Sequence, residues 1–265
     1  MPKKVLIRGA GEHASGTAHR LFRCGFRVVM TELAWPTALR RTVSFCSAIF
    51  EREIVVEEVK GVRYTLDQTE RLSSFDWSHI PVFIDPEFRL KDIWKPEVII
   101  DGRILKKNLD NKVGDAPLVI GFGPGLAAGK DVDFVVETNR GHNLGRIITR
   151  GYSAPDTGVP GSIAGYAGER VVRSPADGTL QTERQLGDIL KKGDLIGTVA
   201  GRAVTAAIPG VLHGLVFPGS RVVINQKLGD VDPRGDRSLC YTLTDKTRNI
   251  SGAALEIILS FFNRR

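Results

Sequence analysis

The segment Gly9-Ala-Gly-Glu-His-Ala14 carries the residue types that bind a phosphate group. It follows an apolar run, opens a helical pattern and fits the fingerprint Gly-x-Gly-x-x-Gly/Ala. Gly9 permits a tight turn, Gly11 lets the backbone approach a pyrophosphate, and Ala14 lets helix and sheet pack closely. Free N–H groups at a helix N-terminus bind phosphates. We therefore predict a nucleotide or dinucleotide site formed by Gly9, Gly11, Glu12 and Ala14.

Glu32 is the acidic residue that such a site requires. It ends the second predicted strand, 21 residues after Gly11, where a carboxylate can accept hydrogen bonds from ribose hydroxyls. Its charge would oppose a 2′-phosphate, so it favours an NAD-like over an NADP-like ligand, although Arg40 and Arg41 nearby weaken that preference. The alternative is a strand–turn–helix unit that binds no ligand.

A second glycine-rich loop also follows a predicted strand. Repeated glycines expose backbone N–H groups to an anion, and Lys130 can add positive charge. The loop is not a P-loop, because Lys130 is not followed by Ser or Thr. The alternative is a tight connection at the edge of a sheet. The predicted cofactor-binding residues here are Gly121, Gly123, Gly125 and Gly129.

Four ionisable residues follow the next predicted strand, at 134–136. They are Glu137, Arg140, His142 and Arg146, which supply a base, an anion clamp and a titratable imidazole. Ligands of open α/β sheets bind beyond the carboxyl ends of the strands. Glu137, Arg140 and His142 are therefore candidate catalytic residues. The alternative is a solvated loop with a surface ion pair.

Two aspartates end other predicted strands. For Asp85 and Asp101 we expect capping of the segments that follow. Lys106, Lys107 and Asn108 come soon after Asp101 and are further candidates for anion binding, or are simply exposed.

The three cysteines are far apart in the sequence, which excludes a disulfide scaffold. Cys24 and Cys46 lie among apolar residues and are predicted to be core residues. Cys240 follows a loop rich in Gly, Asp and Arg, so we expect it to be exposed and include it as a catalytic candidate. Neither the cysteines nor the five histidines have metal-ligand spacing, so we expect no metal site.

The elements that must position these residues alternate between strand and helix up to about residue 150. This alternation predicts a parallel sheet covered on both faces. The expected strands are 3–8, 26–30, 82–85, 98–101, 118–120 and 134–136, and the expected helices are 12–23, 37–51 and 253–262. For the last helix we expect an apolar face of Leu255, Ile258, Leu259 and Phe262.

The region from about residue 170 to 231 has a different sequence pattern, in which short predicted β segments are separated by Gly and Pro. Two halves, each a strand, a Gly turn and a strand, resemble the barrel-sandwich hybrid fold of lipoyl and biotinyl domains. The segment that links the halves, 200–204, has no Lys, and Lys191 and Lys192 lie inside a Gly-Asp turn. This favours a structural or docking module over a carrier of a prosthetic group.

The predicted fold class is α/β, with a Rossmann-like parallel sheet domain and a small barrel-sandwich-hybrid-like β module. The expected parts are a Rossmann-like domain at 1–110, a Gly-rich α/β segment at 111–168, the β module at 169–232, and a C-terminal segment with a helix at 233–265 that packs on the α/β body.

The chain has 265 residues, with 37 basic and 30 acidic side chains, a net charge of +7. The basic residues are scattered and form no nucleic-acid motif, and this surface suits nucleotides or acidic metabolites. Apolar runs are only strand-length, so no membrane span is expected. The N-terminus lacks the features of a signal peptide, which predicts a cytoplasmic protein.

Several runs together resemble the YqeB family, accessory proteins of selenium-dependent molybdenum hydroxylases, and the Gly-rich central run is the most specific of them. The runs are 40–45, 81–86, 107–108, 121–129, 136–146, 157–161, 229–234 and 251–256. The first segment is also similar to the Rossmann part of accessory proteins that sulfurate molybdenum cofactor.

The resemblance implies a role in maturation of a molybdenum hydroxylase, either by insertion of selenium or by handling of the molybdopterin-type cofactor. The implied partners are the hydroxylase client, selenium-delivery proteins and the small anionic cofactor. The cofactor would rest on the Gly loops while Arg140, His142 or a cysteine handles the transferred selenium or sulfur atom. The resemblance supplies no established catalytic residue.

Two other functions fit the same residues. An NAD-dependent oxidoreductase is supported by the Gly9 fingerprint and Glu32, but a Tyr-x-x-x-Lys pair is absent. The third possibility is a non-enzymatic scaffold whose Gly turn is empty. The sequence leaves open whether the chain is an enzyme and whether it forms a homo-oligomer.

Overall fold

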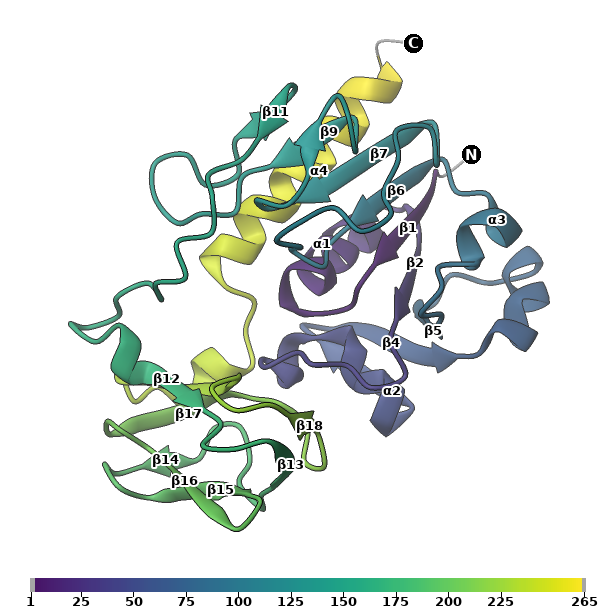
Figure 1. Ribbon diagram of the computed structural model, residues 1–265. Helices are drawn as coiled ribbons and strands as arrows, with labels where there is room; N and C mark the ends of the chain where they lie inside the picture. Colours follow the sequence, from purple (N-terminus) through teal and green to yellow (C-terminus); the bar gives the residue numbers. More distant parts are fainter. Residues whose placement is uncertain (1–2, 264–265) are drawn as a thin grey trace. The chain divides into compact units, whose positions relative to one another are not determined.

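The computed structural model describes residues 3–263 and divides into two compact units, each made of segments distant in sequence (Figure 1). The α/β unit comprises the residues up to Ala34, Ser44–Thr157 and the residues from Leu243 onward. The β unit comprises Trp35–Val43 and Gly158–Thr242. The predicted β module at 169–232 lies inside the β unit.

The α/β unit is built on a nine-stranded sheet in the order β10-β9-β7-β6-β1-β2-β5-β4-β3. The seven central strands run parallel, whereas β3 and β10 pair antiparallel at the two edges. The strands are β1 Lys4–Arg8, β2 Arg27–Glu32, β3 Glu53–Val56, β4 Val59–Tyr64, β5 Ile80–Ile84, β6 Val98–Asp101, β7 Leu118–Phe122, β9 Phe134–Val136 and β10 Ile147–Ile148. A separate two-stranded sheet pairs β8 (Ala127–Ala128) with β11 (Gly151–Tyr152).

Apolar side chains cover both faces of this sheet, as the near-continuous Val/Ile/Leu runs of its central strands require. On one face, helix α1 (Glu12–Arg23) packs against β1 and β2, and α4 (Asp245–Asn263) packs along α1, β7 and β9 (Figure 1). On the other face, alternate strand residues such as Leu6 and Ile99 form a core with Phe88 and Trp94. Three short elements contribute there and at the β3–β4 edge: α2 (Ala48–Glu51), α3 (Leu90–Trp94) and the 3-10 helix η3 (Leu66–Ser73).

Helices α1 and α4 approach each other closely at Gly16. A Cβ added at Gly16 would lie 2.0 Å from Cγ2 of Thr247. The buried face of α4 includes Ile250, Ala254, Ile257 and Ile258. The predicted face is therefore confirmed at Ile258 and wrong at Leu259, which is 45% exposed.

The β unit consists of two antiparallel four-stranded sheets around one apolar core, which includes Leu180, Ile196 and Leu212. One sheet has the order β12 (Val171–Arg173), β19 (Lys227–Asp232), β17 (Gly210–Leu215), β14 (Ile189–Leu190). The other has the order β16 (Arg202–Thr205), β15 (Leu195–Val199), β13 (Gly178–Gln181), β18 (Arg221–Val222). The 3-10 helices η4 (Gly168–Arg170) and η5 (Arg237–Cys240) flank the strands.

The predicted helix at 37–51 is wrong. The segment instead contains η1 (Arg41–Val43), η2 (Phe45–Ser47) and α2. Its first part joins the β unit, where Leu215 N–H donates to the carbonyl of Leu39 at 2.9 Å and Leu39 packs on the core. Tertiary pairing therefore overrides the local helical pattern.

The predicted fold class, a Rossmann-like parallel sheet with a barrel-sandwich-hybrid-like module, is also wrong. The sheet is mixed, because the β3–β4 hairpin and β10 add antiparallel edges. Between β6 and β7 the chain crosses through residues 102–117, which contain no helix. Local patterns identified most strands of the α/β unit, but strand partners depend on distant segments.

Candidate functional site

The first Gly turn joins β1 to α1 as predicted. Gly9 has φ +87°, a conformation that favours glycine, and its N–H donates to the Thr31 carbonyl at 2.9 Å. A Cβ at this position would lie 3.1 Å from Cγ of Arg103. The Arg103 side chain and the segment that carries it therefore lie directly against the turn.

Glu32 lies beside the turn, but its carboxylate is used within the protein. Its oxygens accept hydrogen bonds from the N–H groups of Ala10 and Leu33, each at 2.8 Å. Burial raises the pKa of Glu32 above its ordinary value, against the opposing effect of these bonds and of Arg103. Glu32 thus stabilises the turn through hydrogen bonds from two backbone N–H groups. Its binding of ribose hydroxyls stays a prediction.

A charge-balanced network covers the carboxyl ends of β1 and β6. Arg8 binds both oxygens of Asp110, at 2.6 and 2.7 Å. Arg103 binds Asp101 at 2.6 Å and Asp110 at 3.2 Å, and Asn111 donates to Asp101 at 2.7 Å. This network fixes the segment 102–111 over the first Gly turn, so these guanidiniums are already neutralised.

The residues of that segment proposed for anion binding have other contacts. Lys106 forms an exposed ion pair with Asp156 at 2.8 Å. The side chain of Asn108 accepts from Asn111 N–H at 3.0 Å and so shapes the loop, and Lys107 is exposed. Asp85 caps α3 as predicted, because its carboxylate accepts from the N–H groups of Arg89 and Leu90.

The second Gly loop packs against neighbouring chain. A Cβ at Gly121 would lie 2.4 Å from Cδ1 of Leu126, and one at Gly125 would lie 2.3 Å from the carbonyl oxygen of Leu105. Gly123 and Gly129 have φ values of +85° and +77°. Close packing and turn geometry thus account for these four glycines, and anion binding by their N–H groups stays a prediction.

The start of α4 reaches the first Gly turn. The Glu12 carboxylate accepts hydrogen bonds from the hydroxyls of Thr244 at 2.8 Å and Thr247 at 3.1 Å. Thr247 Oγ1 also lies 2.7 Å from Nδ1 of His13. Neither threonine was among the predicted site residues, although Thr and Asp before an apolar helical pattern are a recognised signal of a helix N-terminus.

Lys246 lies among charges from three different segments. Burial lowers the pKa of its ammonium group, Arg140 lowers it further, and Glu12, Glu137 and Asp245 act in the opposite direction. Arg140 also pairs with Asp245, at 2.9 and 3.1 Å. We call Glu12, His13, Glu137, Arg140 and Lys246 the α4-start cluster.

Glu137 is the buried member of this cluster, with 5% exposure. Its carboxylate accepts from the N–H groups of Asn139 and Ala154, both at 2.7 Å. The loop that follows places His142 on the surface. Arg140 is tied to the start of α4 by its ion pair with Asp245, and Glu12 by its hydrogen bond from Thr244. The charges of Glu12 and Glu137 both act on Lys246, whereas His142 lies at the exposed part of its loop.

A basic groove of about 440 Å³ borders Glu137. Its other polar lining residues include Asn143, Arg146, Arg150, Tyr152 and Ser153. Of these five residues, only Arg146 was predicted from the sequence.

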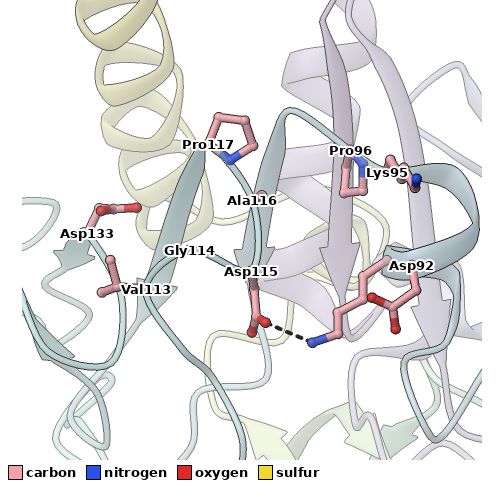
Figure 2. A pocket seen from close by; sticks show the side chains of 10 residues that line it. Asp92, Lys95, Pro96, Val113, Gly114, Asp115, Ala116, Pro117 and Asp133 are labelled. Carbon is pink, nitrogen blue, oxygen red and sulfur yellow. Dashed lines mark hydrogen bonds and ion pairs between the residues drawn. The ribbon is translucent and has the colours of Figure 1, made fainter.

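A larger cavity, of about 750 Å³, lies at the opposite edge of the sheet (Figure 2). It is lined by residues that precede β6, β7 and β9, including Pro96, Pro117 and Asp133. The dashed line in Figure 2 marks the ion pair of Lys91 with Asp115, at 2.8 Å. Because ligands of such sheets bind at the carboxyl ends of strands, this cavity is not our candidate site.

The predictions for two cysteines are wrong. Cys24 is exposed at the end of α1, and Cys240 is buried in the β unit, where its thiol donates to the Leu212 carbonyl at 3.7 Å. Burial raises the pKa of Cys240, so the inert thiol form predominates. Cys46 is buried as expected. Within residues 3–263, no group of three or more His, Cys, Asp or Glu side chains is placed to hold a metal ion.

Comparison with known proteins gives one informative relative. No family model matches the chain. The chain is 41% identical over 260 residues to "Uncharacterized protein YqeB" of Escherichia coli (strain K12), which supports the resemblance to the YqeB family. The match covers 98% of this chain but 48% of that protein, so the chain spans about half the length of this curated relative.

The similar solved structures are more distant. A succinylglutamate desuccinylase/aspartoacylase from Rhodobacter sphaeroides is 12% identical with a TM-score of 0.28, over 87% of this chain and 85% of that one. An aspartoacylase family protein from Mesorhizobium loti is 10% identical with a TM-score of 0.24, over 52% and 57%. TM-scores this low carry no argument about the fold or the activity of this chain. No helix in the described part of the chain has the length and apolar character to cross a membrane.

Proposed function

We propose that this chain binds a small anionic cofactor, of nucleotide or molybdopterin type, at the α4-start cluster. In this proposal it acts as an accessory protein in the maturation of selenium-dependent molybdenum hydroxylases and assists selenium insertion. One observation carries the site: the start of α4 joins Glu12 and His13 of the first Gly turn to Lys246, Arg140 and Glu137. The maturation role is what the resemblance to the YqeB family implies; the curated relative supports the family and its name states no function.

The cluster combines groups that bind anions with groups that move protons. Lys246 and Arg140, the latter paired with Asp245, are the cations of the cluster, and the lowered pKa of Lys246 makes it a better proton donor than an ordinary lysine. The Thr247 hydroxyl lies within hydrogen-bond distance of both Glu12 and His13. An anionic ligand next to Lys246 would favour its charged form and offset the effect of burial.

Binding is tested by thermal unfolding and calorimetry with NAD, ADP and molybdenum cofactor released from a purified hydroxylase. A ligand that binds only the native state raises Tm, and a concentration of 100 times Kd stabilises by about 2.7 kcal/mol. We expect Lys246→Met to abolish the shift and the matched control Lys192→Met, at an exposed site in the β unit, to retain it. If none of the three compounds shifts Tm or releases heat, cofactor binding at the cluster is refuted.

The accessory role is tested in cells that produce a selenium-dependent hydroxylase. We expect the selenium content of the purified hydroxylase, measured by mass spectrometry, to fall when the gene for this chain is deleted. The wild-type chain should restore it and Lys246→Met should not. Unchanged selenium content after deletion would contradict the role, and reduction of NAD by candidate substrates would favour the oxidoreductase.

A further inference from the structure

We infer that the basic groove binds a phosphoryl group, carried as a phosphate monoester or a pyrophosphate. The inference rests on the proposed function, because it names the group by which the α4-start cluster would hold its anionic cofactor. The groove adjoins that cluster through Glu137, which belongs to both.

The first evidence is the state of the two arginines in the groove. Arg146 directly precedes β10 and Arg150 follows it by two residues, so the two residues flank one short strand and both line the groove. Both side chains are exposed, and neither has an ion-pair partner within residues 3–263. In contrast, Arg8 and Arg103 at the same edge of the sheet are paired with carboxylates. Two guanidiniums without an ion pair line one groove, and guanidinium N–H groups are suited to phosphate oxygens.

The second evidence is a buried hydroxyl without a partner. Ser153 lines the groove and is only 6% exposed, and its Oγ makes no hydrogen bond to any described atom of the protein. Buried polar groups are rarely left in this state unless they serve a ligand or another function. A phosphoryl oxygen would satisfy this donor.

The charge of Glu137 does not oppose this assignment strongly. Its two carboxylate oxygens are occupied by the N–H groups of Asn139 and Ala154. These bonds turn the carboxylate toward the backbone and tie β9 to the segment that carries Ser153. The two arginines outnumber this single negative charge, so the groove favours an anion.

The rim of the groove indicates what the phosphoryl group is attached to. Tyr152 lines the groove and is 61% exposed, and an aromatic ring at the rim suits a planar heterocycle. The volume of about 440 Å³ lies within the range of small-ligand sites. A phosphate ester of a purine or pterin therefore fits better than inorganic phosphate alone.

The test is calorimetry of the full chain with inorganic pyrophosphate, AMP and adenosine. We expect pyrophosphate and AMP to bind and adenosine to bind at least about tenfold more weakly. Arg146→Gln and Arg150→Gln should each weaken pyrophosphate binding by about tenfold, with Ser153→Ala having a smaller effect. The matched control is Arg23→Gln, an exposed arginine at the end of α1, and it should leave binding unchanged.

Two further measurements distinguish failure of the phosphoryl site in the groove from loss of folding and from failure of the proposed cofactor site. Arg150→Lys should retain part of the affinity, and circular dichroism should show that every variant is folded. If neither pyrophosphate nor AMP binds, or if the Arg146→Gln/Arg150→Gln variant binds like wild type, the phosphoryl site is refuted. If that variant loses pyrophosphate but Lys246→Met still binds cofactor, the groove stands and the α4-start cluster fails as the cofactor site. If only Lys246→Met loses cofactor, the cluster stands and the groove fails.

Discussion

The buried Asp230 of the β unit gives the sharpest stability prediction. It is 7% exposed and faces three cationic or titratable side chains. The Oδ1 atom lies 3.2 Å from Nδ1 of His213 and 3.7 Å from the guanidinium of Arg170, and Oδ2 lies 3.2 Å from Nζ of Lys227. Burial alone would raise the pKa of Asp230, but the hydrogen bond from His213 and the charges of Lys227 and Arg170 hold it well below its ordinary value.

Asp230→Asn removes the only carboxylate in direct contact with the buried guanidinium of Arg170 among the residues described. Loss of one partner of a buried ion pair destabilises by about 3–5 kcal/mol. The sign of the pH effect follows from the lowered pKa. The stabilisation by Asp230 is fully present above its unfolded pKa of about 3.9 and is lost as the pH falls through the lower folded value. Wild type should therefore lose stability below about pH 4 more steeply than Asp230→Asn.

The assay must report on the β unit alone, because the two units can unfold separately. Hydrogen exchange of the amides in β17 and β19 meets this need, measured at pH 7 and at several values below pH 4, where the stabilisation by Asp230 is lost. The control is Asp236→Asn, because Asp236 is exposed and its pKa is lowered by hydrogen bonds from Ser238. A loss for Asp230→Asn below about 1 kcal/mol, or one equal to that of the control, would refute the reasoning.

Three further predictions concern packing, cysteine reactivity and capping. Gly16→Ala should destabilise the α/β unit by about 1–3 kcal/mol in urea unfolding, because its Cβ would overlap a side chain of α4. Gly168→Ala, in open space, is its control and should have little effect. Iodoacetamide should modify Cys24 in the native protein and Cys240 only after unfolding, as read by mass spectrometry; rapid native modification of Cys240 would contradict its burial. Asp85→Ala should destabilise by about 1 kcal/mol through loss of the α3 cap, and an unchanged urea midpoint would show that the cap contributes nothing.

Local sequence patterns predicted much of the α/β unit. The helix at Glu12–Arg23 and the strands at Val98–Asp101 and Phe134–Val136 have the expected bounds. Apolar periodicity and glycines with positive φ act within a few residues, so they can be read without knowledge of the rest of the chain. The same reasoning anticipated the capping role of Asp85, because a cap depends on the next turn alone.

The sequence also predicted three of the five residues of the α4-start cluster. Glu12 was a candidate as part of the first Gly fingerprint, and Glu137 and Arg140 were candidates because they follow a predicted strand. His13 and Lys246 were missed. Thr244 and Thr247 carry a local signal for the start of a helix, but nothing local shows that they bond to Glu12.

Tertiary structure decided everything that depends on which distant segments meet. Thr244 lies 232 positions from Glu12, yet their side chains bond at 2.8 Å because α4 packs on α1. Contacts between distant segments also determine the antiparallel edges of the large sheet. They likewise place residues 35–43 in the β unit. Burial of a side chain also depends on the tertiary structure, since Cys24 lies on the surface and Cys240 is buried. A local sequence pattern indicates which secondary structure a segment favours. It does not indicate which segments pack against it, because those contacts form between residues far apart in sequence.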